Sequence, residues 1–228
     1  MEAIEAREHA IDVTSFRRDL IAWGQIHFRS FPWRETMDPY SILMAEVMLH
    51  RTQASQVAPI YEQFIRKYPD IAALSSATRE KLHDSLYSLG LRWRVDLIMD
   101  MVMQINEQFA GQVPQGKSDL LSLPGVSDYV ASAVRCFSWN LPDAIVDTNT
   151  VRVAGRVFSL ETKDSSRRNP LFRRLITSLV DSKEPRTYNF ALLDLAAQVC
   201  TKLQRPLCES CPVQKYCLYG NKIRLSTL

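Results

Sequence analysis

Glycine is scarce in this chain, with only seven among 228 residues. Alternating apolar and polar stretches rich in β-branched residues are also rare, which argues against an extensive β-sheet. Apolar residues recur instead at spacings of three and four, the period of a helix with one buried face. The sequence therefore predicts an all-α fold.

Long apolar runs are lacking as well. No segment approaches the roughly 18 apolar residues that a membrane-spanning helix needs. The first residues, MEAIEAREHAIDV, mix acidic and basic side chains and have no apolar centre like that of a secretory signal. We therefore expect no membrane partner and a cytoplasmic, reducing location, where clustered cysteines favour metal over disulfides.

The net charge is small, at +3. Any attraction to nucleic acid must then come from local clusters of basic residues rather than from overall charge. The sequence has no visible repeat, no low-complexity stretch and no linker long enough to separate two independently folding domains. Two lobes that share the chain remain compatible with this pattern.

Prolines and capping residues divide the chain into helical segments. Ser15 is suited to cap an early helix, and Pro39 is suited to start the next one. Further helices are expected near 54–67, 79–89, 93–110, 127–139, 148–159, 168–183 and 187–200.

A short loop with Pro124 and Gly125 precedes the helix expected at 127–139. Ser127 is a favoured N-cap, and Gly125 can adopt backbone conformations that other residues resist. A tight glycine-containing turn at a helix start leaves N–H groups directed outward, where they can bind a phosphate. The tripeptide LPG alone also fits an ordinary turn between helices, so the phosphate site depends on the rest of the chain.

Two carboxylates, Asp147 and Glu46, lie next to or within apolar segments of the sequence. Asp147 follows the apolar residues AIV and precedes the helix expected at 148–159. It can cap that helix, and a carboxylate held there would remain ionised and could stabilise a developing cation. Glu46 lies in the apolar segment MAEVML, where burying a carboxylate is costly unless it has a partner or a chemical role.

Four of the five cysteines fall within eighteen residues, in the pattern C-x7-C-x2-C-x5-C. Four thiolates can enclose one metal centre, and both tetrahedral zinc and a [4Fe–4S] cluster accept four cysteines. The spacing alone leaves both open. The predicted ligands are Cys200, Cys208, Cys211 and Cys217, whereas Cys136 lies on an apolar helix face and is expected in the core.

Several motifs occur together in a fixed order: FPWR at 31–34, AEVMLHRTQ at 45–53, SLGLRWR at 88–94, LPGVSDYVASAV at 123–134, VDTNTVRV at 146–153, then the cysteine loop. From about Phe16 to Cys217 the chain resembles the helix-hairpin-helix (HhH-GPD) superfamily of DNA glycosylases, which contains endonuclease III and the MutY-type adenine glycosylases.

The resemblance implies two lobes with a DNA groove between them. One is a six-helix barrel over 31–143, with the helix-hairpin-helix at about 118–138. The other is a helical lobe formed by 1–30 and 144–228, with a [4Fe–4S] cluster in the loop 200–217. The first cysteine gap usually spans six residues in the family and spans seven here. The second glycine of an LPGVG hairpin is replaced by Ser127.

The resemblance also implies catalytic roles. Asp147 stabilises the oxocarbenium-like sugar or helps water attack C1′, and Asn149 helps arrange the site. Glu46 matches the glutamate that protonates adenine in MutY-type enzymes; with thymine it would instead position water or bind the flipped base. Tyr129 stands where endonuclease III has its Schiff-base lysine, and tyrosine there resembles the Mig-type thymine/uracil mismatch glycosylases. A phenol forms no Schiff base, so strand cleavage by a lyase step should be weak or absent.

The same comparison predicts contacts with double-stranded DNA by a monomer. Arg51 would fill the vacated base stack or contact the widowed base, and Leu91 would enter the duplex as an apolar wedge. The full set of predicted DNA contacts is His50, Arg51, Gln53, Leu91, Gly125, Val126 and Ser127.

The leading hypothesis is a monofunctional glycosylase that flips out and excises thymine or uracil mispaired with guanine. Tyr129 motivates it, together with the short segment after Cys217, because MutY-type enzymes carry a further domain for 8-oxoguanine. One alternative is an adenine glycosylase without that domain, which FPWR and Glu46 favour. Another is a catalytically silent module that binds mismatched DNA, against which Asp147 and Glu46 both argue.

Overall fold

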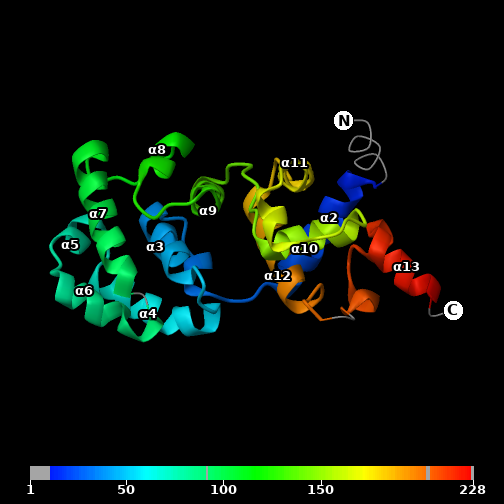
Figure 1. Ribbon diagram of the computed structural model, residues 1–228, viewed down its shortest axis with the longest axis horizontal. Helices are drawn as coiled ribbons and strands as arrows, with labels where there is room; N and C mark the ends of the chain where they lie inside the picture. The colour runs from blue at the N-terminus through cyan, green and yellow to red at the C-terminus, as the bar shows by residue number, and fades with distance from the viewer. Residues whose placement is uncertain (1–10, 91, 204–205, 227–228) are drawn as a thin grey trace. The chain divides into compact units, whose positions relative to one another are not determined.

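The computed structural model describes residues 11–90, 92–203 and 206–226 (Figure 1). Within these ranges every regular element is an α-helix or a short 3-10 helix, which confirms the predicted all-α fold. The helices found there are each too short or too polar to cross a membrane. The chain divides into a central unit, Ser30–Asn140, and a flanking unit that combines Met1–Arg29 with Leu141–Leu228.

The helices of the central unit are α3 (Pro39–Leu49), α4 (Ala54–Lys67), α5 (Ile71–Ser75), α6 (Arg79–Leu86), α7 (Arg92–Phe109), α8 (Lys117–Ser122) and α9 (Asp128–Trp139). Helix α3 packs against α4 and α9, while α7 packs against α5 and α6 (Figure 1). The five-residue helix α5 was not expected from the sequence, because it is too short to display a helical period.

Helix α3 is buried on nearly every side. Pro39 occupies its first turn, as predicted, and the Asp38 carboxylate accepts a hydrogen bond from the Ser41 N–H at 2.8 Å. Leu43 and Met44 are completely buried. A helix that is apolar all round belongs in a protein interior. Helix α3 is therefore an interior helix of the central unit.

The helices of the flanking unit are α2 (Val13–His27), α10 (Thr148–Val157), α11 (Pro170–Leu179), α12 (Pro185–Gln198) and α13 (Leu218–Ser226). Helix α12 packs against both α2 and α10 (Figure 1). The approach of α2 to α12 depends on Gly24, since a β-carbon there would lie 2.4 Å from the β-carbon of Ala191. Phe16, Leu20 and Tyr188 are fully buried in the core of this unit.

The cap of α2 differs from the prediction. Asp12, not Ser15, is the N-cap, and its Oδ1 accepts a hydrogen bond from the Ser15 N–H at 3.0 Å. The hydrogen bonds from Ser15 lower the pKa of Asp12. The helix begins earlier than expected because an aspartate three residues upstream caps the first turn as well as a serine does.

An ion pair between a half-buried arginine and a buried aspartate anchors the end of the first segment of the flanking unit. The Asp194 carboxylate on α12 is fully buried, and its Oδ1 accepts a hydrogen bond from Arg29 Nε at 2.6 Å. Its Oδ2 accepts a second bond from the Arg29 backbone N–H at 3.0 Å. Both carboxylate oxygens are thus used to hold the chain at the last residue of this segment.

Candidate active site and cysteine loop

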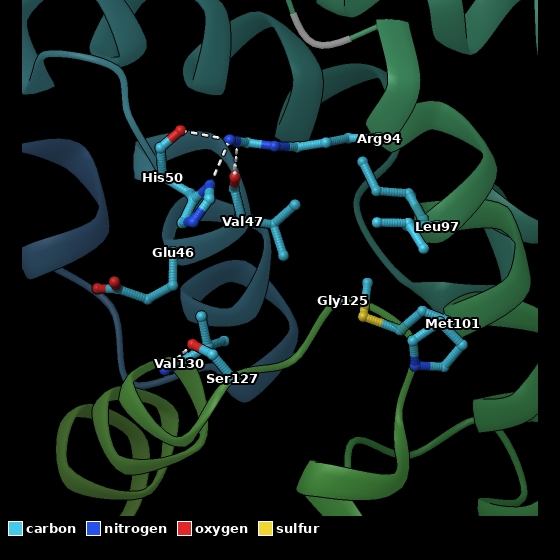
Figure 2. A pocket seen from close by; sticks show the side chains of 11 residues that line it. Glu46, Val47, His50, Arg94, Leu97, Met101, Gly125, Ser127 and Val130 are labelled. Carbon is cyan, nitrogen blue, oxygen red and sulfur yellow. Dashed lines mark hydrogen bonds between the residues drawn. The ribbon is translucent and has the colours of Figure 1, made fainter. Parts of the chain in front are cut away.

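Glu46 lies on α3 and is only 4% exposed. It lines a cavity of about 90 Å³ together with His50, Arg94, Gly125 and Ser127 (Figure 2). Helix α3 contributes Glu46, α7 contributes Arg94, and the turn before α9 contributes the glycine and the serine. The central unit thus brings four of the predicted site residues to one cavity.

The turn between α8 and α9 has the backbone that the sequence predicted. Gly125 has φ +78°, in the left-handed region that favours glycine. The Ser127 hydroxyl accepts a hydrogen bond from the Val130 N–H at 3.3 Å and so caps α9. Val126 differs from its neighbours, since its side chain is buried and its N–H donates to the Leu123 carbonyl at 3.2 Å.

Tyr129 lies in the first turn of α9 and is half-buried. It follows Asp128, which pairs with Lys117 of α8 at 3.2 Å. This ion pair joins the two helices of the hairpin next to the tyrosine. The position of Tyr129 is therefore fixed by the capped start of α9 and by its link to α8.

Asp147 is the N-cap of α10, as predicted. Its Oδ1 accepts hydrogen bonds from the Asn149 N–H at 2.8 Å and the Thr150 N–H at 2.7 Å. The Asp147 N–H in turn donates to the Thr150 hydroxyl at 3.0 Å, which completes a capping box. Two backbone N–H groups of the first turn of α10 therefore hold Asp147 Oδ1 in place.

Asn149 connects Asp147 to an arginine that the sequence interpretation missed. Asn149 Nδ2 donates to Asp147 Oδ2 at 2.7 Å, and Asn149 Oδ1 accepts from Arg152 Nη1 at 3.1 Å. Arg152 also donates from Nε to the Cys200 carbonyl at 2.9 Å and from Nη2 to the Ala196 carbonyl at 2.8 Å. One guanidinium therefore links the capped carboxylate to the start of the cysteine loop.

Burial lowers the pKa of Arg152, although the group stays charged. A signal for this residue was present in the sequence. Asn149, Arg152 and Arg156 are spaced by three and four residues on a single helix, which places them on one face.

The cysteine loop begins just after α12 and ends where α13 starts. The Leu207 N–H donates to the Val199 carbonyl at 3.1 Å and so brings the two sides of the loop together. All the loop cysteines are free of disulfides. A single cavity is lined by the four predicted ligands, Cys200, Cys208, Cys211 and Cys217, together with Arg156 and Gly220. Within the described residues, no three potential ligands gather closely enough to be identified as a site for one metal ion.

Burial raises the pKa of the Cys211 thiol to about 12, and it also raises that of Cys217. Two sulphur atoms of the loop also accept hydrogen bonds. Arg156 Nη1 donates to Cys200 Sγ at 3.2 Å, and the Gly220 N–H donates to Cys217 Sγ at 3.3 Å. Buried thiols of this kind become thiolates when a cationic centre binds them.

The predicted DNA contacts around α3 lie in the turn that follows the helix. His50 is the C-cap, Arg51 comes next, and Gln53 is the N-cap of α4; all three are exposed. Arg51 has φ +64°, an uncommon backbone conformation for a residue with a β-carbon. Leu91, the predicted wedge, lies outside the described residues.

Comparison with known proteins places these features in one family. The sequence profile of the HhH-GPD superfamily of base excision DNA repair proteins matches residues 44–176. A thymine-DNA glycosylase of Aeropyrum pernix is 33% identical over 92% of this chain and 96% of its own. A thymine/uracil-DNA glycosylase of Pyrobaculum aerophilum is 34% identical over 93% and 94% of the two chains.

Solved structures agree with these sequence relatives. The structure of a thermostable thymine-DNA glycosylase matches with a TM-score of 0.83 and 30% identity, over 92% of this chain and 97% of that one. An adenine DNA glycosylase of Rattus norvegicus is also similar, at 34% identity over 95% of this chain but only 44% of its own length. The chain belongs to the HhH-GPD superfamily of base excision DNA repair proteins.

Proposed function

We propose that the protein is a DNA glycosylase that excises thymine or uracil mispaired with guanine in double-stranded DNA. The observation that carries the proposal is the Asp147 carboxylate, held at the start of α10 by three donors. It lies in a chain that matches a thymine-DNA glycosylase along nearly the whole of both sequences.

The Asp147 carboxylate supplies the negative charge that the reaction requires. When the bond between the base nitrogen and C1′ breaks, its electron pair leaves with the base and positive charge develops on the sugar. A carboxylate that is already oriented stabilises that charge without having to reorganise. Water then adds to C1′ and loses a proton, which completes the hydrolysis.

Asn149 and Thr150 act on this carboxylate rather than on the base. The Asn149 side chain and the two backbone N–H groups restrict both carboxylate oxygens to one orientation. We assign Asn149 to the arrangement of the site on this ground.

Glu46 and Tyr129 belong to the central unit and take different roles in the proposal. Glu46 is buried at the edge of a cavity, where its carboxylate would bind the flipped base or position water. Tyr129 has a phenol at the position where enzymes of the endonuclease III type have an amine nucleophile. It can therefore contact the nucleotide but cannot form a Schiff base. The enzyme should therefore release the base and leave the strand intact.

The cysteine loop fits a [4Fe–4S] cluster, which we propose as its cofactor. Four thiols line one cavity, and the Arg156 guanidinium donates a hydrogen bond to Cys200 Sγ. Bound by Cys200, Cys208, Cys211 and Cys217, the cluster would hold the loop between α12 and α13 together and stabilise the buried thiolates. Iron and sulphide analysis of purified protein tests this assignment, and zinc in place of iron would overturn it.

The proposed partner is double-stranded DNA that contains the mismatch, bound by a monomer in the cytoplasm beside the nucleoid. The exposed His50, Arg51 and Gln53 and the turn at Gly125 and Ser127 provide the contacts. The contribution of Val126 would be through its backbone, since its side chain is buried.

Single-turnover assays on matched duplexes with T:G, U:G, A:G and A:8-oxoguanine pairs test the proposal. Release of thymine or uracil, without strand cleavage, is the expected result. Adenine release without activity on T:G would instead support the adenine glycosylase that Glu46 and the adenine relatives suggest. Tight mismatch binding with no base released would leave only a binding module.

A further inference from the structure

Arg94 is buried beneath the end of α3, with only 3% of the residue exposed. It extends from α7, and Figure 2 shows its guanidinium directed at the last turn of α3. Nη1 donates to the Val47 carbonyl at 2.5 Å, while Nη2 contacts His50 Nδ1 at 2.6 Å and donates to the His50 carbonyl. The final carbonyls of a helix have no partners within the helix. Arg94 provides such partners from another helix.

The turn that Arg94 supports has an unusual residue in its left-handed position. Helices commonly end with glycine in this conformation, because a β-carbon is disfavoured there. Here the residue is Arg51, with φ +64°. A hydrogen bond from the Thr52 N–H to the Leu49 carbonyl at 3.2 Å closes the same turn. The backbone of Arg51 is thus kept in a strained conformation while its side chain remains exposed.

The two arginines also repel each other. Burial is the main cause that lowers the pKa of Arg94, and the charge of Arg51 lowers it further. Because arginine keeps its proton in proteins, this repulsion is not relieved by titration. It is relieved when the Arg51 guanidinium lies away from α3 and near a polyanion such as duplex DNA.

We infer that Arg94 is a positioning residue for mismatch binding: it closes the end of α3 and holds the following turn so that Arg51 is presented to the duplex. The inference rests on the proposed function, in which Arg51 contacts DNA at the mismatch. Arg94 itself is buried and acts through His50 and the backbone of the turn.

A double-mutant cycle on DNA affinity tests the inference. Dissociation constants are measured for a duplex that carries a tetrahydrofuran abasic analogue opposite guanine, using wild type, Arg94→Lys, Arg51→Ala and the double variant. Lysine keeps the charge of Arg94 but cannot donate to both carbonyls as a planar guanidinium does. We expect each single variant to bind about tenfold more weakly and the double variant to be no weaker than either, because residues in one network are not additive. Arg135→Lys is the matched control, since it also removes an arginine bond to a backbone carbonyl, that of Gln115, and should bind as wild type.

Thermal unfolding supplies a second test that holds even if Arg94→Lys folds poorly. Arg94→Lys should lower the melting temperature. Adding Arg51→Gly to that variant should restore it, because glycine adopts the left-handed conformation unaided, whereas adding Arg51→Ala should not. Neither Arg51→Gly nor Arg51→Ala should restore the DNA affinity of the Arg94→Lys variant. Multiplicative losses in the cycle, wild-type affinity in Arg94→Lys, or equal melting temperatures with glycine and alanine at position 51 would each overturn the inference. If the wild-type protein releases no base from any mismatch, the proposed function fails, and that result is distinct from the outcomes that would overturn the role of Arg94.

Discussion

Removing the Arg152 side chain should separate the stability of the flanking unit from the orientation of the Asp147 carboxylate, for which we propose a catalytic role. Arg152→Met loses two hydrogen bonds to the carbonyls of Ala196 and Cys200 and a third to Asn149. Hydrogen bonds that involve a charged group contribute about 1.5–3 kcal/mol each, and the partly exposed setting favours the lower end. We expect the free energy of unfolding to fall by about 3–5 kcal/mol, the sum of two or three such bonds.

Under the proposed function, we expect the effect on catalysis to come from the bond between Arg152 and Asn149. Without it, Asn149 is free to turn away from Asp147, and the carboxylate loses one of its three donors. If that bond acts fully in the transition state, the single-turnover rate should fall about 10- to 100-fold. The rate is measured with saturating enzyme on a T:G duplex at a temperature where circular dichroism shows every variant folded, and iron content is measured on the same samples.

Arg17→Met is the matched control for this experiment. Arg17 donates to the carbonyls of Leu179 and Ser178 at 3.1 and 2.7 Å at the end of α11, in the same unit, but does not contact the asparagine. It should lose comparable stability and keep its rate. Equal rates in the Arg152 and Arg17 variants would refute the link to Asp147, as would a rate loss that is wholly explained by lost iron.

Four further changes test separate parts of the structure. Asp147→Asn should lower the single-turnover rate by at least about 10²-fold while DNA affinity stays near wild type, and turnover at the wild-type rate would contradict its role. Tyr129→Lys should yield a borohydride-trapped adduct with the duplex; the absence of any adduct would count against a position beside C1′. Cys211→Ala should reduce the bound iron and the visible absorbance, and unchanged iron content would remove it from the ligand set. Gly24→Val should destabilise the packing of α2 on α12 by about 2 kcal/mol or more, measured by urea unfolding, because the added atoms overlap Ala191.

Local chemistry explains which features could be predicted from the sequence. The cap at Asp147 and the left-handed glycine at position 125 depend on residues close in sequence, and both are confirmed. The spacing of Asn149, Arg152 and Arg156 places Arg152 on the site face of its helix, but the carbonyls that Arg152 and Arg94 bind could not be predicted, because they lie 44 to 48 residues away along the chain. Nothing in an isolated arginine indicates which distant helix end it will close. Such contacts become visible only when the packing of the helices is known.

The flanking unit is assembled from two segments that are distant in the sequence, and this has a consequence for synthesis. Helix α2 leaves the ribosome early, but α12, which covers its Gly24 face, begins only at Pro185. At about 5–20 residues per second, the apolar side chains of α2 wait on the order of ten seconds for their partner. The central unit, by contrast, is contiguous from Ser30 to Asn140 and can fold while the rest is still being translated. We therefore expect the nascent chain to bind chaperones through α2 until α12 emerges.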